Sequence, residues 1–479
     1  MSSPDACVVR RILTERTSIV ATSCVVALIA GCTLGPAYRR PDVEVPAAWH
    51  EAPPGGAAAA APPRADWWHG FGSPELDRYI AEARNANIDL AAALARVREA
   101  DAVARVAGAA LLPTVDASAG SFSERVQSTS SSYANFHQVT VGVGASYMID
   151  FWGKSRAARE AAVATATASR RDRVTVELTV MTGVATTFFQ TVELQERVAV
   201  AEQNLRTADS ILGGLRRQLA AGIATALDVA QQETTVATLA ASVPPLQQQL
   251  RQSVDALALL VGRNPEKLEA TSTTLADLTL PAIDAGLPSD LMARRPDIAE
   301  AESMLVAANA NIRVARAAFF PQIELTASGG FASTALSSLL DPGSRVFDVG
   351  ANLAQPIFHG GALAGQLDYA RARYDELLAA YRKAILSAFG NVEDALVAVQ
   401  RTGEQVERQQ DAVAKARRAH EFAQTQLRSG TVNILTVLST ETALFTAQDV
   451  LVQARFAHLQ ALVSLYGALG GGWQEGSAT

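Results

Sequence analysis

The fold is decided by the stretch VERQQDAVAKARRAHEFAQTQLRSGTVNILTV, residues 406–437. Every seventh position in its first part is held by Val406, Val413, His420 and Leu427. A sustained seven-residue repeat of mainly apolar residues keeps two α-helices in contact along a left-handed supercoil. Gly430 interrupts the repeat, and glycine can enter the left-handed conformation that ends a helix because it has no Cβ atom. Residues 361–466 are therefore predicted to form a long helix, a tight turn and a second helix that runs back.

The same hairpin occurs a second time, nearer the N-terminus. There a seven-residue repeat ends at Leu219, Gly222 stands where Gly430 stands in the later copy, and the repeat resumes at Val229. The offset between the two glycines is 208 positions, and it also relates Leu112-Pro113 to Phe320-Pro321. Heptads, glycines and prolines that match at one offset indicate an internal duplication.

Composition narrows the class of protein. The chain has 479 residues, of which 49% are hydrophobic and 19% charged, which is ample for a large core. Its formal net charge of −7 argues against a nucleic-acid partner.

The first residues have the pattern of an export signal. Arg10, Arg11 and Arg16 form a basic region before an apolar run at 19–30, and Gly31-Cys32 follow its last residue, Ala30. Small residues directly before a cysteine resemble the lipobox of bacterial lipoproteins. We therefore predict a signal peptide over 1–31 and a Cys32 that carries a diacylglycerol on sulfur and an acyl chain on nitrogen. The alternative is an ordinary signal peptide with an incidental cysteine.

The rest of the chain divides into segments of different composition. A proline-rich tether at 32–66 precedes Trp67-Trp68, where order is expected to begin. Helices are predicted over 75–111, after an N-cap at Ser73, and over 288–320. Pro244-Pro245 is expected to kink or break the first returning helix. The predicted organisation is a first repeat at 67–265 (strand hairpin 112–149, helical hairpin 154–262), a connecting segment at 266–287, a second repeat at 288–472 (strand hairpin 320–357, helical hairpin 361–467) and a tail at 473–479.

After each proline at the helix ends, the apolar period changes from helical to two. Alternation at 139–147, 323–327 and 347–353, with a weaker segment after Pro113, predicts four strands of about ten residues, joined by loops at 121–136 and 333–344. Such strands fit a half-buried sheet in a soluble α+β protein, or a membrane barrel that is apolar outside and polar inside. Four strands cannot close a barrel, so the second alternative requires several chains. Three aromatic residues at the strand ends are predicted to lie at a membrane interface: Phe151, Trp152 and Phe358.

Several motifs together resemble the outer-membrane efflux protein family, the TolC/OprM-like group, and within it the lipidated OprM/NodT branch. They are Leu34-Gly35-Pro36-Ala37-Tyr38, Asp150-Phe151-Trp152-Gly153-Lys154, Arg294-Arg295-Pro296-Asp297, Ala318-Phe319-Phe320-Pro321 and Tyr466-Gly467-Ala468-Leu469-Gly470-Gly471-Gly472-Trp473. The resemblance implies an α+β membrane protein of the outer membrane of a Gram-negative bacterium, built as a homotrimer. Four strands from each copy would make a shared 12-stranded barrel, continued into the periplasm by a coiled-coil helical barrel.

No catalytic motif stands out in the sequence, so we expect a protein that is not an enzyme and has no cofactor besides the lipid on Cys32. The resemblance implies passive conduction of substrates delivered by an inner-membrane pump and a periplasmic adaptor, in RND-type multidrug or small-molecule efflux. The alternatives are the exit duct of a type I protein secretion system and a structural envelope lipoprotein without a channel. His420 and His458 fall on heptad positions and are expected to be packing residues.

The resemblance also implies a periplasmic gate just after the two helical turns. The matching positions are Asp228 in the first repeat and Arg428, Leu435, Thr436 and Ser439 in the second. Thr436 and Ser439 depart from the family pattern, which has aspartates there. We therefore predict a mainly apolar constriction at Leu435 with at most one acidic ring, at Asp228. The alternative for Asp228 is a helix-start residue favoured by the N-terminal dipole.

Overall fold

The computed structural model describes residues 35, 37–50, 63–129, 132–269, 271, 273–283 and 285–474. Cys32 and the predicted signal peptide lie outside these residues. The chain divides into two compact units. One comprises residues up to Pro41 together with Val97–Ala168 and Ala301–Tyr381, and the other comprises Asp42–Arg96, Ser169–Glu300 and the chain from Arg382 onward. Both sequence repeats contribute to both units.

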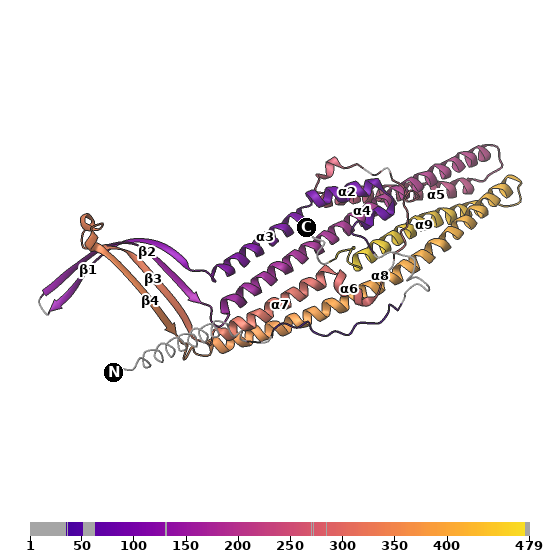
Figure 1. Ribbon diagram of the computed structural model, residues 1–479. Coiled ribbons are helices and arrows are strands. Elements are labelled where there is room, and N and C mark those ends of the chain that lie inside the picture. The colour runs from indigo at the N-terminus through magenta and orange to yellow at the C-terminus, as the bar shows by residue number, and fades with distance from the viewer. Residues whose placement is uncertain are drawn as a thin grey trace, which may run out of the picture. The chain divides into compact units, whose positions relative to one another are not determined.

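The internal duplication is confirmed, because three helices of the first repeat begin and end at residues equivalent to the bounds of three helices of the second. Figure 1 labels these helices. Adding the offset of 208 to both bounds of α3, α4 and α5 gives the bounds of α7, α8 and α9. The pairs are α3 Ile88–Ala109 with α7 Pro296–Ala317, α4 Lys154–Ala220 with α8 Ala362–Arg428, and α5 Ala226–Leu260 with α9 Ile434–Ala468. The long helices α4 and α8 have 67 residues each, as the heptads predict.

The prediction of one helix before each strand hairpin was wrong, because each is broken once. The breaks fall at Asn87, between α2 Pro74–Ala86 and α3, and at the equivalent Arg295, between α6 Pro288–Arg294 and α7. Both residues are extended. The Asn87 side chain donates a hydrogen bond to the carbonyl of Leu260, and that of Arg295 donates one to the carbonyl of Ala468. These carbonyls end α5 and α9, where no helical partner is available. Each break therefore provides a cap for the end of another helix.

The expected break at Pro244-Pro245 does not occur, since α5 runs from Ala226 to Leu260 without interruption. A proline inside a helix leaves a carbonyl in the preceding turn without its donor. Both prolines are exposed, so water can donate to that carbonyl in place of the missing N–H.

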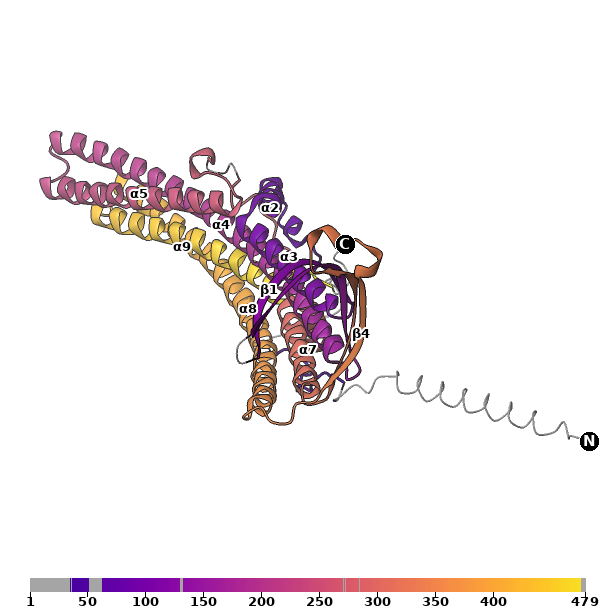
Figure 2. The ribbon, with the colours of Figure 1, turned by 90° about the vertical axis from the view of Figure 1, so that its left-hand side faces the viewer.

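The four strands form one antiparallel sheet in the order β1-β2-β3-β4, seen curving in Figure 2. They are β1 Thr114–Thr129, β2 Ser132–Ile149, β3 Gln322–Ser333 and β4 Arg345–Ala354. The first hairpin is much longer than predicted, with strands of 16 and 18 residues. The predicted loop at 121–136 is largely strand, because β1 and β2 stay in register as far as Gln127 opposite Tyr133. The segment between β3 and β4 is a loop with two 3₁₀ turns, as expected.

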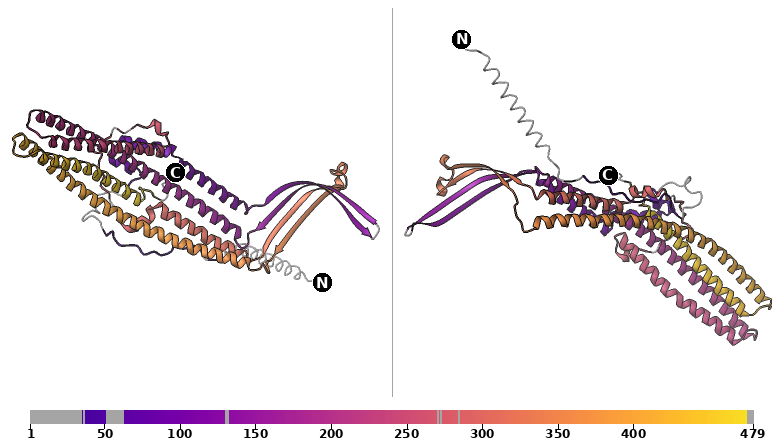
Figure 3. Two further views of the ribbon diagram at one scale, coloured as in Figure 1. Left: turned by 180° about the vertical axis from the view of Figure 1, so that it is seen from behind. Right: turned by 90° about the horizontal axis from the view of Figure 1, so that it is seen from below.

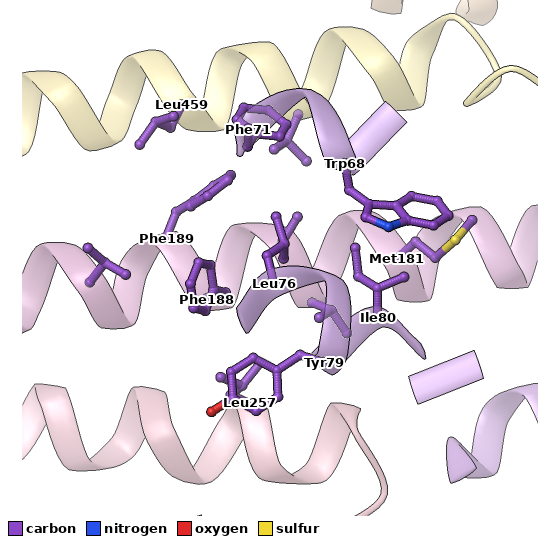
Figure 4. Close-up of a cluster of buried hydrophobic side chains, with 14 of the residues drawn as sticks. Trp68, Phe71, Leu76, Tyr79, Ile80, Met181, Phe188, Phe189, Leu257 and Leu459 are labelled. Carbon is purple, nitrogen blue, oxygen red and sulfur yellow. The ribbon is translucent and has the colours of Figure 1, made fainter. Parts of the chain in front are cut away.

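The second unit contains a core of aromatic and aliphatic side chains (Figure 4). Phe71, Phe188 and Phe189 are fully buried, with the ring centroids of Phe71 and Phe189 4.9 Å apart. Trp67 stacks on Tyr466 at 4.9 Å, so the N-terminal 3₁₀ turn packs against the end of α9. Among the described residues, no helix is both long enough and apolar enough to cross a membrane.

Gly470 offers a direct test of the break at Arg295. Its φ is +84°, and an added Cβ would lie 2.1 Å from the carbonyl oxygen of Arg294. Gly470→Ala should destabilise the protein by at least the ~1–3 kcal/mol of a left-handed non-glycine residue and lower the apparent melting temperature in detergent, followed by circular dichroism. The control is Gly214→Ala in α4, where nothing lies within 4 Å of the added Cβ. Equal melting temperatures for both variants would contradict the packing described above.

Candidate functional site

The sheet separates apolar and polar side chains onto its two faces. Strand register places Ala145 beside both Val115 and Ala327, and Leu325 beside both Tyr147 and Ala351. Because side chains alternate along a strand, this face is apolar over most of the area where the four strands pair, as far as the row that ends in Arg345 beside Phe331. The opposite face carries, apart from Met148 and the rim, small and polar residues: Thr114, Asp116, Ser118, Gly120, Thr140, Gly142, Gly144, Ser146, Glu324, Thr326, Ser328, Asp348, Gly350 and Asn352.

The apolar face is exposed and has the height of a bilayer core. Phe347 is 87% exposed and Val349 77%, so nothing in the described chain covers them. The band runs along β2 from Val139 to Ile149. With a rise of ~3.4 Å per residue and a tilt of ~45°, it stands about 25 Å tall, the height of the apolar band of membrane barrels. This face can contact lipid, whereas the opposite face can line water.

Both edges of the sheet lack a partner strand in the described chain. β1 pairs with β2 alone, and β4 pairs with β3 alone. The outer N–H and C=O groups of these two strands therefore need other partners, and in an apolar medium another strand must provide them.

The three predicted interface aromatics do not form one cluster. The Trp152 indole donates a hydrogen bond of 2.8 Å to the carbonyl of Pro321 and lies 4.7 Å from the Phe320 ring. Phe151 packs edge-on against Trp152 at 4.8 Å. Phe358 is 86% exposed, after the end of β4. Trp152, with Phe151 packed on it, connects the end of the first strand hairpin to the start of the second. The exposed Phe358 side chain can contact lipid.

The two helical turns lie side by side (Figure 3). Gly222 and Gly430 have φ of +75° and +74°, as predicted for residues that end helices. Below the turns, apolar residues of all four helices pack together, among them Leu212, Val229, Ala423 and Val437. The turns are thus built on a shared support.

Asp228 is the third residue of α5 and forms a capping box with Thr225. Its Oδ2 atom accepts hydrogen bonds of 2.7 Å from the Thr225 backbone N–H and from the Thr225 hydroxyl. These bonds, the backbone bond foremost, lower the pKa of the Asp228 carboxyl. In the second repeat Thr436 takes the same position, where its N–H and hydroxyl donate to the side-chain oxygen of Asn433 at 3.2 and 3.1 Å. Of the predicted gate residues, Asp228 and Thr436 are therefore both engaged in helix capping.

Leu435, in contrast, does not take part in helix capping. Its side chain is 49% exposed in the first turn of α9. The equivalent residue of the first repeat, Leu227, is 66% exposed, and nearby Ile223 is 77% exposed. Leu227 and Ile223 were missed from the sequence, although the offset of 208 points from Leu435 to Leu227. The exposed tips thus carry three large apolar side chains per chain.

The last two predicted gate residues lie in different helices: Arg428 is the last residue of α8, and Ser439 is in α9, after Leu435. Ser439 is exposed, and its hydroxyl donates to the carbonyl of Thr436. Arg428 lines a groove of about 710 Å³ together with Arg206, Arg217 and several amide side chains from α4 and α8. The groove can therefore hold acidic or hydrogen-bonding groups of a partner.

The predicted packing histidines are enclosed between helices. Nδ1 of His458 lies 2.9 Å from the Thr402 hydroxyl, and Nε2 of His420 lies 2.8 Å from the Gln424 amide nitrogen. Burial lowers the pKa of both imidazoles. No group of three or more metal-binding side chains occurs within the described ranges.

Glu441 is a second feature that the sequence did not reveal. It lies in α9 with no exposed surface, and neither carboxylate oxygen has a hydrogen-bond partner. Burial raises the pKa of its carboxyl to about 7. The equivalent residue in the first repeat, Glu233, instead makes an exposed ion pair of 2.8 Å with Arg216.

Glu441 should make stability depend on pH. Its pKa is higher in the folded chain than the ordinary 4.5, so its carboxyl is neutral at low pH and is ionised at a cost as the pH rises through 7. We expect the free energy of unfolding to fall by about 2.5 kcal/mol between pH 5 and pH 8 on its account, most of it below pH 7, where the unfolded chain is ionised and the folded chain is not. Glu441→Gln should flatten this dependence in detergent melts, whereas Glu233→Gln should not. A wild-type slope unchanged in Glu441→Gln would contradict the assignment.

Comparison with known proteins agrees with this geometry. The sequence model of the family described as "Outer membrane efflux protein" matches residues 79–263 and 287–471, again 208 positions apart. The chain is 40% identical to the pyoverdine export outer membrane protein OpmQ of Pseudomonas aeruginosa, over 94% of this chain and 95% of the relative. It is 33% identical to the cation efflux system protein CusC of Escherichia coli, over 94% of this chain and 98% of the relative.

Solved structures show the same fold. The outer-membrane channel OprN matches with a TM-score of 0.86 and 28% identity, over 92% of this chain and all of that one. A structure of CusC matches with a TM-score of 0.83 and 30% identity, over the same shares. The predicted fold class, with long helical hairpins and four strands per chain, is confirmed. The chain belongs to the outer membrane efflux protein family, and it is an efflux protein of the outer membrane.

Proposed function

We propose that three copies of this chain assemble into a closed duct that conducts substrates passively through the outer membrane. The observation that carries this proposal is the sheet, whose apolar face is about 25 Å tall and whose two edges are unpaired within the chain. Strand β4 of one copy pairs with β1 of the next. Twelve strands then close the barrel, with the apolar faces toward lipid and the polar faces toward the lumen.

The helical tips close the duct at rest. Leu435, Leu227 and Ile223 of three copies bring nine apolar side chains to the narrow end. An apolar constriction excludes ions because it is too narrow and too dry to replace their hydration. Asp228 contributes little to this barrier, since its carboxylate already accepts two hydrogen bonds from Thr225.

A pump and an adaptor supply the substrate and the energy. The groove beside Arg428 is the contact surface that we assign to the adaptor, because its arginines and amides can bind acidic and polar side chains. The cargo is a small organic molecule. Export of a pyoverdine-like molecule is favoured by the relatives named for pyoverdine export, which are 40% and 41% identical, against 34% and 33% for those named for toluene or cation efflux.

Single-channel recording in planar bilayers tests the duct and its gate. Wild type should show small, rare openings, and Leu435→Ala should show openings that are several times larger and longer, because the apolar barrier is reduced. Adding Asp228→Ala should change little. Leu259→Ala, which removes a leucine at the far end of α5 that is 66% exposed, against 49% for Leu435, is the control and should behave as wild type.

Two other results of this recording would count against the proposal. Large, steady currents in both wild type and Leu435→Ala would refute the gate while leaving the duct. An absence of conductance in both, with trimers confirmed by native mass spectrometry, would refute the duct.

We also propose that Cys32 carries the lipid anchor, on the strength of the Ala30-Gly31-Cys32 motif. Cells that express wild type should incorporate labelled palmitate into the protein, and Cys32→Ser should abolish the label. Cys24→Ser, inside the predicted signal peptide, is the matched control. Labelling that survives in Cys32→Ser would refute the anchor.

A further inference from the structure

The β1–β2 hairpin extends well beyond the other two strands. The last pair between β2 and β3 is Val139 with Ser333, whereas β1 and β2 keep one register as far as Gln127 with Tyr133 and pair again, after a register shift, at Thr129 with Ser132. The residues beyond the four-stranded part, 122–127 and 133–138, are called the hairpin extension below. At ~3.4 Å per residue it is about 20 Å long, and with the same tilt of ~45° it rises about 14 Å past the apolar band.

The polarity of the two faces is reversed in the hairpin extension. On the side that continues the apolar band lie Ser123, Arg125, Gln127, Tyr133, Asn135 and His137. On the side that continues the polar face lie Phe122, Glu124, Val126, Ala134, Phe136 and Gln138. Phe122 and Phe136 are 55% and 56% exposed, so more than half of each side chain is uncovered in the described chain.

A side-chain contact supports this assignment of faces. The Arg125 guanidinium lies 4.6 Å from the centre of the Tyr133 ring, which requires both side chains to be on one face. Arg125 and His137 are therefore on the outward face, and Glu124 is the only ionisable side chain on the inward face among residues 122–127 and 133–138.

The reversal makes sense if the hairpin extension stands in water beyond the membrane. Polar side chains then face the medium outside the barrel, and the rings face the axis along which cargo leaves. Glu124 and Phe136 are directly opposite each other across the two strands, so their Cβ atoms are about 4.5–5.5 Å apart. A carboxylate beside the face of an aromatic ring binds an organic cation, through charge and through the ring quadrupole.

We propose that the inward face of the hairpin extension is an exit-mouth binding site for aromatic organic cations, formed by Glu124, Phe136 and Phe122 of each copy. The site rests on the proposed duct, since only a closed barrel gives these residues a common axis. Its ligands are planar cations that stack on Phe136 or Phe122 while Glu124 neutralises their charge. Gln138, opposite Phe122, can accept hydrogen bonds from amino substituents.

Fluorescence anisotropy with ethidium, an aromatic cation, tests the site on the full-length protein in detergent. We expect saturable binding to wild type, weakened at least about fivefold in Glu124→Gln and in Phe136→Leu. Glu324→Gln is the matched control, because Glu324 is on the same polar face but lies opposite Met148 and Asn352, not a ring. It should bind ethidium as wild type does, and an anionic dye such as fluorescein should not bind saturably.

The outcomes separate this site from the duct. Equal weakening in Glu124→Gln and Glu324→Gln would show a general attraction of cations to an acidic lumen and would overturn the site. Non-saturable ethidium binding to trimers that conduct would also overturn it and leave the duct intact. A lack of trimers and of conductance would refute the duct by itself, whatever ethidium does.

Discussion

The constraint on which the rest of this protein depends is the need to pair every backbone N–H and C=O group of the sheet where no water is available. An unpaired group in hydrocarbon costs several kcal/mol, and the outer sides of β1 and β4 each present a row of them. No rearrangement within four strands removes two edges. The apolar face therefore requires contact with lipid. In lipid the sheet must close into a barrel so that its edges are paired, and four strands can be closed only by adding strands from further copies of the chain. Oligomerisation follows here from backbone chemistry and does not require an affinity between side chains.

The duplication shows how one backbone can carry two sets of side chains. Three helices of each repeat agree in their bounds, yet equivalent positions differ in chemistry. Asp228 is matched by Thr436 under a similar cap, and the exposed Glu233 by the buried Glu441. Asn87 and Arg295 cap equivalent carbonyls with different groups. The turns and caps occur in both repeats because backbone N–H and C=O groups at the helix ends need hydrogen-bond partners. Side chains that only contact a neighbouring residue can differ between the repeats. The apolar exposed tip, Leu227 and Leu435, is retained without any such backbone demand, which is why it stands out as functional.

The sequence predicted most of the helical architecture because heptads and turn glycines are local patterns. It did not predict the breaks at Asn87 and Arg295, since the carbonyls that these residues cap lie 173 residues away along the chain. The loop wrongly expected at 121–136 has a different cause. Serine and asparagine are common in turns, but in a strand whose outward face meets water they satisfy the alternation equally well. The capping role of Asp228 could be anticipated from its place three residues after Thr225. Only the two hydrogen bonds in the structure show that its carboxylate is used in the cap and is therefore less available to the gate.

The reversed polarity of the hairpin extension illustrates what period-two patterns hide. Along β1 the residues still alternate, so the sequence alone contains no sign of which face is which. Only the register, which places Phe122 on the face of Ser118 and Gly120, shows that an aromatic ring follows a row of small polar groups on one face. If every apolar side chain of the sheet faced lipid, these rings would lie on the same face as the apolar band. Phe122 and Phe136 lie on the other face and beyond the band, with Phe136 opposite the Glu124 carboxylate. This position is explained by contact with what passes through the barrel and not by contact with the membrane around it.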